Sequence, residues 1–473
     1  MMFEPRRIHP IGIILNLISV IKSYVVPAVF LFFFGKNVDF NIYFILGAIL
    51  LVTSVIVISI LDWLKFTYRV EDGEVRIEHG IFVKKKRYIP IERIQTINIS
   101  AGIIQQLFKL VKVQIETASG GIKAEAELIA VKRVDAESIE KAIASYKQEK
   151  APVQIEEDGS VVKQLPTYKM TKKELLVAAS TSSGVGVILS AIAAFFSQFE
   201  EFIPYEKIFD QFEFLTNASI TVYISLVFIA FLITWIISVI GVILKYAHFT
   251  VIKDEKEIKI SKGIFEKQQL SIPLSRIQAI RIVQNPIRQL LGYSTIHIET
   301  AGGSVGDNDT STILFPVVSS KIVKSLLSEY LPDFEIQESL NVLPQKSKKR
   351  YVTRKLLIAL IPVVLLSYYF MPWGLFSLII LPISLYWGYC TFKDAGWIII
   401  DNQLNLRYRF ISKTMVLIKR NKIQSIKGKT TYFQKRNQLQ TVSISIKSGL
   451  IARQFTIKDM NELDVDEIMS WYI

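Results

Sequence analysis

Long apolar blocks separate segments of this chain in which apolar and polar residues alternate one by one. The blocks cover residues 11–34, 40–64, 175–196, 218–244 and 356–392, and the last is long enough for two short helices that turn at Pro372 and Gly374. A helix needs about 20 apolar residues to cross the hydrocarbon core of a bilayer. The pattern therefore predicts an α-helical membrane protein with six transmembrane helices in three hairpins.

A different period follows each hairpin. Residues 66–70 and 75–79 are alternating runs around the turn Asp72-Gly73, and similar runs occupy 249–262 and 397–409. Alternation predicts strands with one buried face and one solvated face. Apolar residues at helical spacing then follow near 135–146, near 319–330 and from about 463 to the end. We expect three β-rich barrel-like modules, each closed by a C-terminal helix.

A short string shows that hairpin and module together form a repeat. The string reads IPIERIQTI at 89–97, IPLSRIQAI at 272–280 and IKRNKIQSI at 418–426, so that 183 and 146 residues separate successive copies. The segment Ile-Glu-Thr-Ala occurs at 115–118 and again at 298–301, which are also 183 residues apart. Two matches at one separation indicate an internal repeat, which must be recognised before the fold is assigned.

The repeat defines the expected domains. Residues 1–64, 175–244 and 356–392 are the three transmembrane hairpins, and residues 65–148, 245–331 and 393–473 are the three modules. Residues 149–174 are a charged linker and residues 332–355 a basic linker.

The string, the Ile-Glu-Thr-Ala segment and the preceding membrane hairpin resemble the bacterial pleckstrin-homology (PH) domain family, and the three-repeat arrangement resembles its six-span members. The resemblance covers nearly the whole chain and is weaker in the third copy, where Lys419 replaces the Pro and Lys422 the Arg. It implies a PH-like barrel in each module and a bacterial source. It also suggests a partner, namely a smaller single-hairpin protein with one similar module.

The distribution of charge predicts the orientation in the membrane. The chain carries a net charge of +14, and its Lys and Arg residues gather where the apolar blocks meet the modules. The hairpin tips at 35–41 and 199–216 have few basic residues, and the second tip is acidic. Because Lys and Arg near span ends stay on the cytoplasmic side, both termini and all modules should be cytoplasmic, in a multi-pass protein of the plasma membrane. The single cysteine, Cys390, precludes an intramolecular disulfide, which suits that compartment.

The repeated string supplies the candidate ligand, partner or structural-pair positions. These are Arg93, Gln95, Arg276, Gln278, Lys422 and Gln424. In one interpretation the cations form a notch for a lipid head group or for an acidic residue of a partner. In the other, which we favour, they are internal bonds of Arg93 to Glu116 and of Arg276 to Glu299, since a partly buried charge needs a partner.

Two groups of basic residues are candidate contacts with anionic lipid. They are Lys84, Lys85, Lys86 and Arg87 in the first module and Lys427, Lys429, Lys435 and Arg436 in the third. Each basic residue near the surface contributes about 1 kcal/mol of attraction to anionic lipid. The third module has 14 Lys and Arg against seven Asp and Glu. Nucleic acid is a weaker candidate partner, because the membrane anchor keeps the lipid surface nearer. For the run at 84–87 a solvated loop is the default interpretation, and contact with anionic lipid is the alternative.

Nothing in the sequence indicates catalysis. The four histidines lie far apart, and neither a Walker A string nor a Rossmann glycine pattern occurs. We expect no cofactor and no metal. The sequence favours a non-enzymatic membrane scaffold that binds a partner membrane protein, anionic lipid head groups or both, with a role in envelope maintenance or defence. A component of a transporter or export system is the alternative, although Lys22 is the one basic residue deep in a span.

Overall fold

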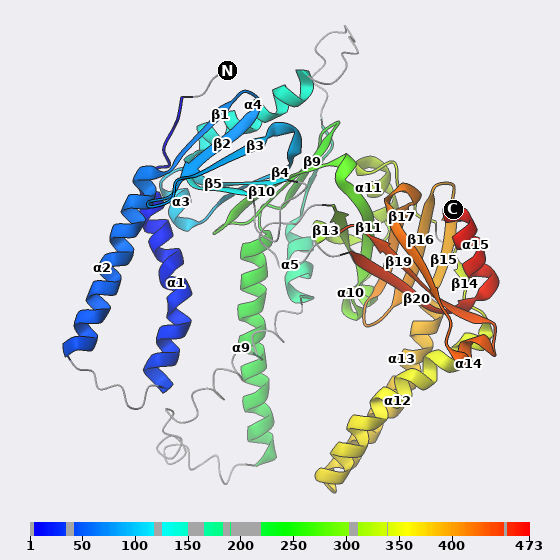
Figure 1. Ribbon diagram of the computed structural model, residues 1–473. Helices are drawn as coiled ribbons and strands as arrows, with labels where there is room; N and C mark the ends of the chain where they lie inside the picture. Colours follow the sequence, from blue (N-terminus) through cyan, green and yellow to red (C-terminus); the bar gives the residue numbers. More distant parts are fainter. Residues whose placement is uncertain are drawn as a thin grey trace. The chain divides into compact units, whose positions relative to one another are not determined.

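The structure is a computed structural model that describes residues 4–34, 42–117, 125–149, 165–182, 190, 219–301, 311–337, 339–448 and 452–473. It contains two compact units (Figure 1). Unit 1 comprises Met1–Leu165, Asp254–Ser261 and Phe265–Leu274, and unit 2 comprises Pro166–Lys253, Lys262–Ile264 and Ser275–Ile473. The predicted hairpin tips at 35–41 and 199–216 and most of the linker 149–174 lie outside the described residues.

Unit 1 joins two helices to two antiparallel sheets. Helices α1 (Ile11–Phe34) and α2 (Ile42–Lys65) precede the sheet β1 (Thr67–Glu71), β2 (Glu74–His79) and β3 (Lys85–Pro90). In the other sheet β6 (Ala126–Lys132), β5 (Leu110–Thr117), β4 (Ile94–Ala101), β10 (Lys267–Pro273) and β9 (Glu257–Lys262) follow one another. Short helix α3 (Ile103–Leu107) connects β4 to β5, and α4 (Arg133–Glu149) covers the core through Ile139 and Ile143.

Unit 2 contains a seven-stranded sheet. The order is β13 (Ser311–Ser319), β12 (Tyr293–Thr300), β11 (Ile277–Gln284), β17 (Lys413–Lys419), β16 (Gln403–Arg409), β15 (Gly396–Ile400) and β14 (Asn341–Val342). A smaller sheet holds β18 (Ile423–Lys429), β19 (Leu439–Ile446) and β20 (Arg453–Asn461). Strands β7 (Thr167–Lys169) and β8 (Thr250–Lys253) pair with each other.

Helices cover or connect the strands of unit 2. Helix α10 (Pro286–Leu291) begins at Asn285, whose side chain accepts a hydrogen bond from the backbone N–H of Arg288 at 2.7 Å. Helices α11 (Val323–Tyr330) and α15 (Glu462–Tyr472) end the second and third repeats, and α14 (Tyr432–Lys435) lies between β18 and β19. Helices α4, α11 and α15 confirm the predicted helix at the end of each repeat.

The prediction that each repeat closes into its own barrel is wrong. Strand β4 of the first repeat pairs with β10 of the second, and β11 of the second pairs with β17 of the third. The last three strands of one repeat therefore share a sheet with the first three of the next. The alternation of apolar residues was interpreted correctly as strands, but it does not specify which strand lies beside which.

Three of the helices are candidate membrane spans by length and hydropathy among the described residues. They are residues 221–246 of α9 (Ile220–Tyr246), α12 (Gln345–Tyr369), and residues 373–394, which comprise the 3₁₀ turn η3 (Trp373–Ile379) and α13 (Ile380–Asp394). The prediction of six spans is not confirmed. The first two apolar blocks form α1 and α2, whereas the third block, 175–196, is described only over α5 (Lys172–Ser180) and the residues just after it and at residue 190.

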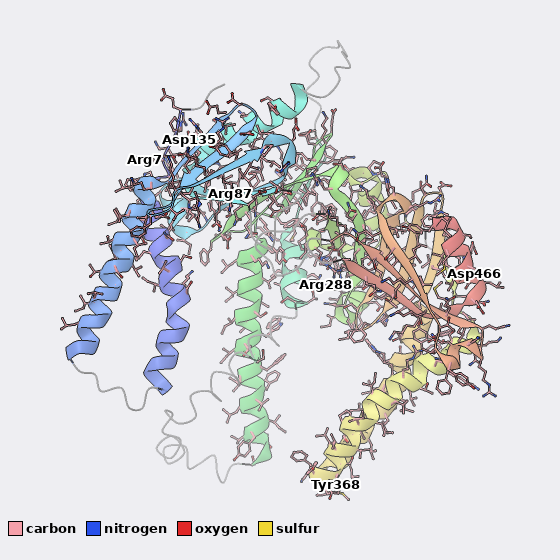
Figure 2. All side chains as sticks on the ribbon, in the orientation of Figure 1. Arg7, Arg87, Asp135, Arg288, Tyr368 and Asp466 are labelled. Atoms are coloured by element: carbon pink, nitrogen blue, oxygen red, sulfur yellow. The ribbon has the colours of Figure 1, made fainter. Side chains whose placement is uncertain are left out.

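The last two spans form the predicted hairpin. Tyr368, near the end of α12, lies at the end of this hairpin farthest from the sheets of unit 2 (Figure 2). A Cβ atom on Gly388 of α13 would lie 2.7 Å from Cα of Val352 in α12. The two backbones approach so closely that only a glycine fits, and such small residues are typical of helix contacts in membranes.

Candidate interaction site

The repeated string has one local structure. Its third to fifth residues form a 3₁₀ turn, η1 (Ile91–Arg93), η2 (Leu274–Arg276) or η4 (Arg420–Lys422), and the following strand begins with the next Ile. The cation thus ends the turn and the Gln is the second residue of the strand. Gln278 is buried and donates a hydrogen bond to the carbonyl oxygen of Arg276 at 3.1 Å, whereas Gln424 is exposed. The side chain of Gln95 lies outside the described part of the chain.

Unit 2 brings two copies of the string together. Nζ of Lys422, in the third copy, donates a hydrogen bond to the carbonyl oxygen of Ser275, in the second copy, at 3.0 Å. Lys422 therefore has a structural role at the junction between η2 and η4. Arg276 is partly buried, and burial lowers the pKa of its guanidinium. Arg93 is exposed and forms no ion pair with any residue that the structure describes.

The predicted ion pair between Arg276 and Glu299 is wrong. Glu299 on β12 is fully buried, and its carboxylate lies 3.2 Å from Nε of Arg281 and 3.1 Å from a terminal guanidinium nitrogen of Arg453. Ser448 also donates a hydrogen bond to it at 3.1 Å. Glu299 does form ion pairs, as predicted for a buried acid, but its partners are Arg281 on β11 and Arg453 on β20. The pair with Arg453 joins the second repeat to the third. Among the described residues, the predicted pair of Arg93 with Glu116 is likewise not formed.

Burial and neighbouring arginines together lower the pKa of a histidine on β12. Burial is the main cause that lowers the pKa of His297 on β12 to about 3, and Arg281, Arg453 and Arg288 lower it further. The imidazole is therefore neutral at physiological pH. Its environment is that of a packed sheet, which supports the structural interpretation of this histidine.

A cavity of about 840 Å³ opens beside the third copy of the string. Its charged lining is mixed: Nζ of Lys419 lies 3.1 Å from the Asp333 carboxylate and 5.1 Å from the centre of the Phe334 ring. The other lining residues include Glu335, Asp401, Asn402, Gln403, Arg420, Asn421 and Tyr472. Because acids balance the bases, this cavity is not built for an anionic head group.

A feature missed by the sequence interpretation is the tip of the second hairpin in each module. The tips carry Ile81-Phe82, Ile264-Phe265 and Phe410-Ile411, and each pair is followed by a lysine: Lys84, Lys267 or Lys413. The separations are again 183 and 146 residues, so the repeat itself contained this signal. Phe82 is 96% exposed and Phe410 is 70% exposed.

Each tip lies at the module end of an apolar helix. Ile81 and Phe82 line an apolar groove of about 660 Å³ along α2, which also includes Val57 and Leu61. In the second repeat, the backbone N–H of Ile264 donates to the carbonyl oxygen of Leu244 in α9 at 3.1 Å. In the third, the indole N–H of Trp387 in α13 donates to the carbonyl oxygen of Phe410 at 3.0 Å. Nζ of Lys355 in α12 lies 4.7 Å from the centre of the Phe410 ring.

The basic residues predicted to contact lipid lie on two strands and one short helix. Lys85, Lys86 and Arg87 belong to β3, whose first four residues are exposed, and Figure 2 labels Arg87. Lys84 forms an ion pair with Glu78 at 2.6 Å and lowers the pKa of that carboxyl. The remaining four, Lys427, Lys429, Lys435 and Arg436, are exposed on β18 and at the end of α14.

Buried polar contacts anchor membrane helices to the sheets. Asp459 on β20 is fully buried and accepts hydrogen bonds from Arg350 of α12 at 2.9 Å, from Arg354 of α12 and from Gln434 at 2.8 Å. Asp394 at the end of α13 pairs with Arg409 of β16. In the described ranges no group of three or more His, Cys, Asp and Glu residues could hold a metal ion.

Comparisons with known proteins agree with this architecture. A family model described as Bacterial PH domain matches three segments, residues 18–147, 187–331 and 356–473. The UPF0699 transmembrane protein YdbT of Bacillus subtilis (strain 168) is 43% identical over 487 residues, covering 100% of this chain and 99% of the relative. The UPF0699 transmembrane protein YdbS of the same organism is 31% identical over 78 residues, covering 16% of this chain and 49% of the relative. No solved structure matches. Three family matches that span most of the sequence confirm the expected family: the chain belongs to the bacterial PH domain family and resembles its UPF0699 membrane proteins.

Proposed function

We propose that this protein is a non-enzymatic scaffold of the bacterial plasma membrane. Its cytoplasmic PH-like sheets lie against the inner leaflet, where they gather a partner membrane protein together with anionic lipid head groups. The observation that carries this proposal is the threefold repetition of an exposed apolar tip beside a lysine at the end of an apolar helix.

The chemistry of the tips suits the membrane interface. Exposed Phe and Ile side chains lose water when they enter the region between head groups and acyl chains, and a nearby Lys can reach phosphates. Ile81-Phe82, Ile264-Phe265 and Phe410-Ile411 occupy the same two positions in their repeats, so each repeat supplies its own apolar tip. Each contact is weak alone, but the membrane helices hold it at a high effective concentration.

The anchors favour a scaffold over a transporter. Asp459 binds two arginines of α12, and Asp394 binds Arg409, so the ends of α12 and α13 are tied to the sheets of unit 2. The buried charged side chains of the described residues, Glu116, Glu299, Arg409 and Asp459, all lie on strands. Ion or proton pathways through a membrane need buried charges inside the spans.

The test is an affinity purification of the full chain from detergent-solubilised membranes, with proteins and phospholipids identified in the same eluate. We expect anionic phospholipid above its share of the bulk membrane, and a second membrane protein in a fixed ratio. The matched variant Lys84→Gln, Lys267→Gln, Lys413→Gln removes the lysine of each tip and should lower the lipid enrichment. An eluate with the bulk lipid composition and no second protein contradicts the proposal.

A further inference from the structure

The two strand pairings between repeats have the same register. Asn98 of β4 pairs with Leu270 of β10, and Arg281 of β11 pairs with Val416 of β17. Moving Asn98 and Leu270 along the chain by 183 and 146 residues, respectively, gives Arg281 and Val416. The same pairing therefore occurs twice. Strand β4 or β11, the fourth strand of its own repeat, pairs with β10 or β17, the third strand of the next repeat.

The third repeat has the same accepting strand, β18. Strand β18 is the edge of the sheet β18-β19-β20, and among the described residues no strand pairs with its outer side. Ala279 and Ile280 of β11 are fully buried beside β17, whereas their counterparts Ser425 and Ile426 are only half-buried. An unpaired edge of this kind presents a row of backbone donors and acceptors to an incoming strand.

We propose that the outer edge of β18 is a docking site for an antiparallel strand of the β10 and β17 type, presented by a separate PH-like protein in the same membrane. Strand docking deepens the proposed function, on which it rests, because it names the surface that holds the partner protein. Addition of a strand to an exposed sheet edge is a recurring mode of recognition, in which backbone hydrogen bonds supply affinity.

Charge identifies the kind of partner. Suppose that a strand docks on β18 in the register of the two observed pairings. Lys427 would then lie opposite the residue equivalent to Leu270 and Val416, and Lys429 opposite the residue equivalent to Gln268 and Thr414. The equivalent strand at the start of this chain is β3, which has Arg87 and Lys85 at those two positions. Like charges directly opposite each other destabilise a strand pair. A second copy of this chain is therefore a poor partner, and the site selects a strand with neutral or acidic residues there.

The first test uses the full chain and asks whether two copies dock on each other once the repulsion between their strands is removed. In a Cys390→Ser background, Lys429→Cys and Lys85→Cys place one cysteine on each strand at positions predicted to face each other between two copies. Facing residues in antiparallel strands have Cα atoms about 4.5–5.5 Å apart, within the range of a disulfide. Adding Lys427→Glu puts a carboxylate opposite Arg87. We expect at least about a threefold gain in disulfide-linked copies in membranes relative to the chain that keeps Lys427.

The controls fix the register and the charge. Replacing Lys85→Cys by Tyr88→Cys moves the second cysteine three residues along β3, and cross-linking should fall to background. Equal yields at positions 85 and 88, or no gain from Lys427→Glu, overturn the proposed edge.

The second test concerns the natural partner. Lys427→Glu with Lys429→Glu should reduce the protein that copurifies with the full chain at least fivefold, whereas Lys435→Glu with Arg436→Glu changes the net charge equally away from the edge and should not. A photocrosslinker at position 429 should label the third strand of the partner's module. Unchanged capture by the edge variant refutes the edge and leaves the scaffold function standing. Register-specific cross-links without any copurified protein support the edge and contradict the scaffold function.

Discussion

Buried charges in this protein join repeats that are far apart in the sequence. Glu299 of the second repeat is satisfied by Arg453 of the third, over a separation of 154 residues. An acid buried without such partners would be costly, because the charged form loses its hydration. The third repeat lacks an acid at the position equivalent to Glu299, which is Ser445, as is expected of a bond that forms between repeats rather than within one.

Glu299 and Arg453 should be coupled energetically. Glu299→Gln should lower the free energy of unfolding by about 3 kcal/mol, since it leaves two partly buried arginines without a counter-charge. The double variant with Arg453→Gln should cost less than the sum of the single variants, because contacting residues are not additive. The measurement is chemical unfolding in detergent.

Arg276→Gln is the control for that cycle, because Arg276 does not contact Glu299. Its effect should add to that of Glu299→Gln within about 0.5 kcal/mol. Coupling of Glu299 to Arg276 but not to Arg453 would contradict the observed contacts.

His297 should make stability depend on pH. Its pKa in the folded chain is about 3, against 6.5 in an unfolded chain. Between these values the unfolded chain binds a proton that the folded chain does not, so stability is complete above pH 6.5 and falls as the pH falls. The loss is about 1.4 kcal/mol for each pH unit below 6.5. His297→Gln should remove this slope between pH 6.5 and pH 5 in thermal unfolding; an unchanged slope would show that another group causes it.

At the scale of elements, the attachment of α12 to β20 depends on one side chain. Asp459 receives hydrogen bonds from two arginines of α12 and from Gln434 of α14. It also has a φ of 55°, the left-handed region that Asp tolerates better than most residues. Asp459 therefore combines an unusual backbone conformation with hydrogen bonds to both arginines of α12.

Asp459→Asn should therefore loosen α12 and lower the free energy of unfolding by about 3 kcal/mol. Asp466→Asn is the matched control, because Asp466 is exposed on α15 (Figure 2) and its replacement should change stability by less than about 0.5 kcal/mol. Limited proteolysis near Lys346 and thermal unfolding would report the loosening. Equal behaviour of the two variants would argue against the anchor.

Most elements could be predicted from the sequence, but their pairing could not. The runs at 66–70 and 75–79 correspond to β1 and β2, and the turn expected at Pro372 and Gly374 separates α12 from α13. The alternation of apolar residues sets which face of a strand is buried, and it is the same whether the neighbouring strand comes from the same repeat or the next one. The barrels were therefore predicted wrongly from a correct assignment of strands.

The same reason explains the errors at the candidate site. Arg276 and Glu299 recur with Arg93 and Glu116 at one separation, which indicated a pair within each repeat. The actual partners, Arg281 and Arg453, lie on β11 and β20, and Arg453 is brought near only by the sheet shared between the second and third repeats. By contrast, the tip residues Phe82 and Phe410 were available from the repeat and needed no knowledge of strand order.

At the scale of the whole molecule, the charge at the helix ends predicts the orientation in the membrane. The basic residues at the start of α12 include Lys346, Lys348 and Lys349, whereas the turn between α12 and α13 has none. In a Cys390→Ser chain, a membrane-impermeant thiol reagent applied to intact cells should label Trp373→Cys and not Asn341→Cys. Both should react in permeabilised cells. Labelling of Asn341→Cys in intact cells would reverse the proposed topology.

The shared sheets also change how the protein should be tested. Residues 393–473 contain β15, β16 and β17, which pair through β17 with β11 of the preceding repeat. A fragment beginning at residue 393 would expose the edge of β17 that β11 covers in the full chain. Binding to membranes or partners is therefore best measured with the full chain.

The depth of the hairpin tips in the membrane tests the central proposal most directly. Single cysteines at Phe82 and Phe410, each in a Cys390→Ser full chain in vesicles, would carry a fluorophore that brominated lipids quench on contact. Asn402→Cys, in the exposed turn between β15 and β16, is the control. We expect strong quenching at both tips and little at the control. Equal and weak quenching at all three positions would show that the modules do not lie against the membrane surface.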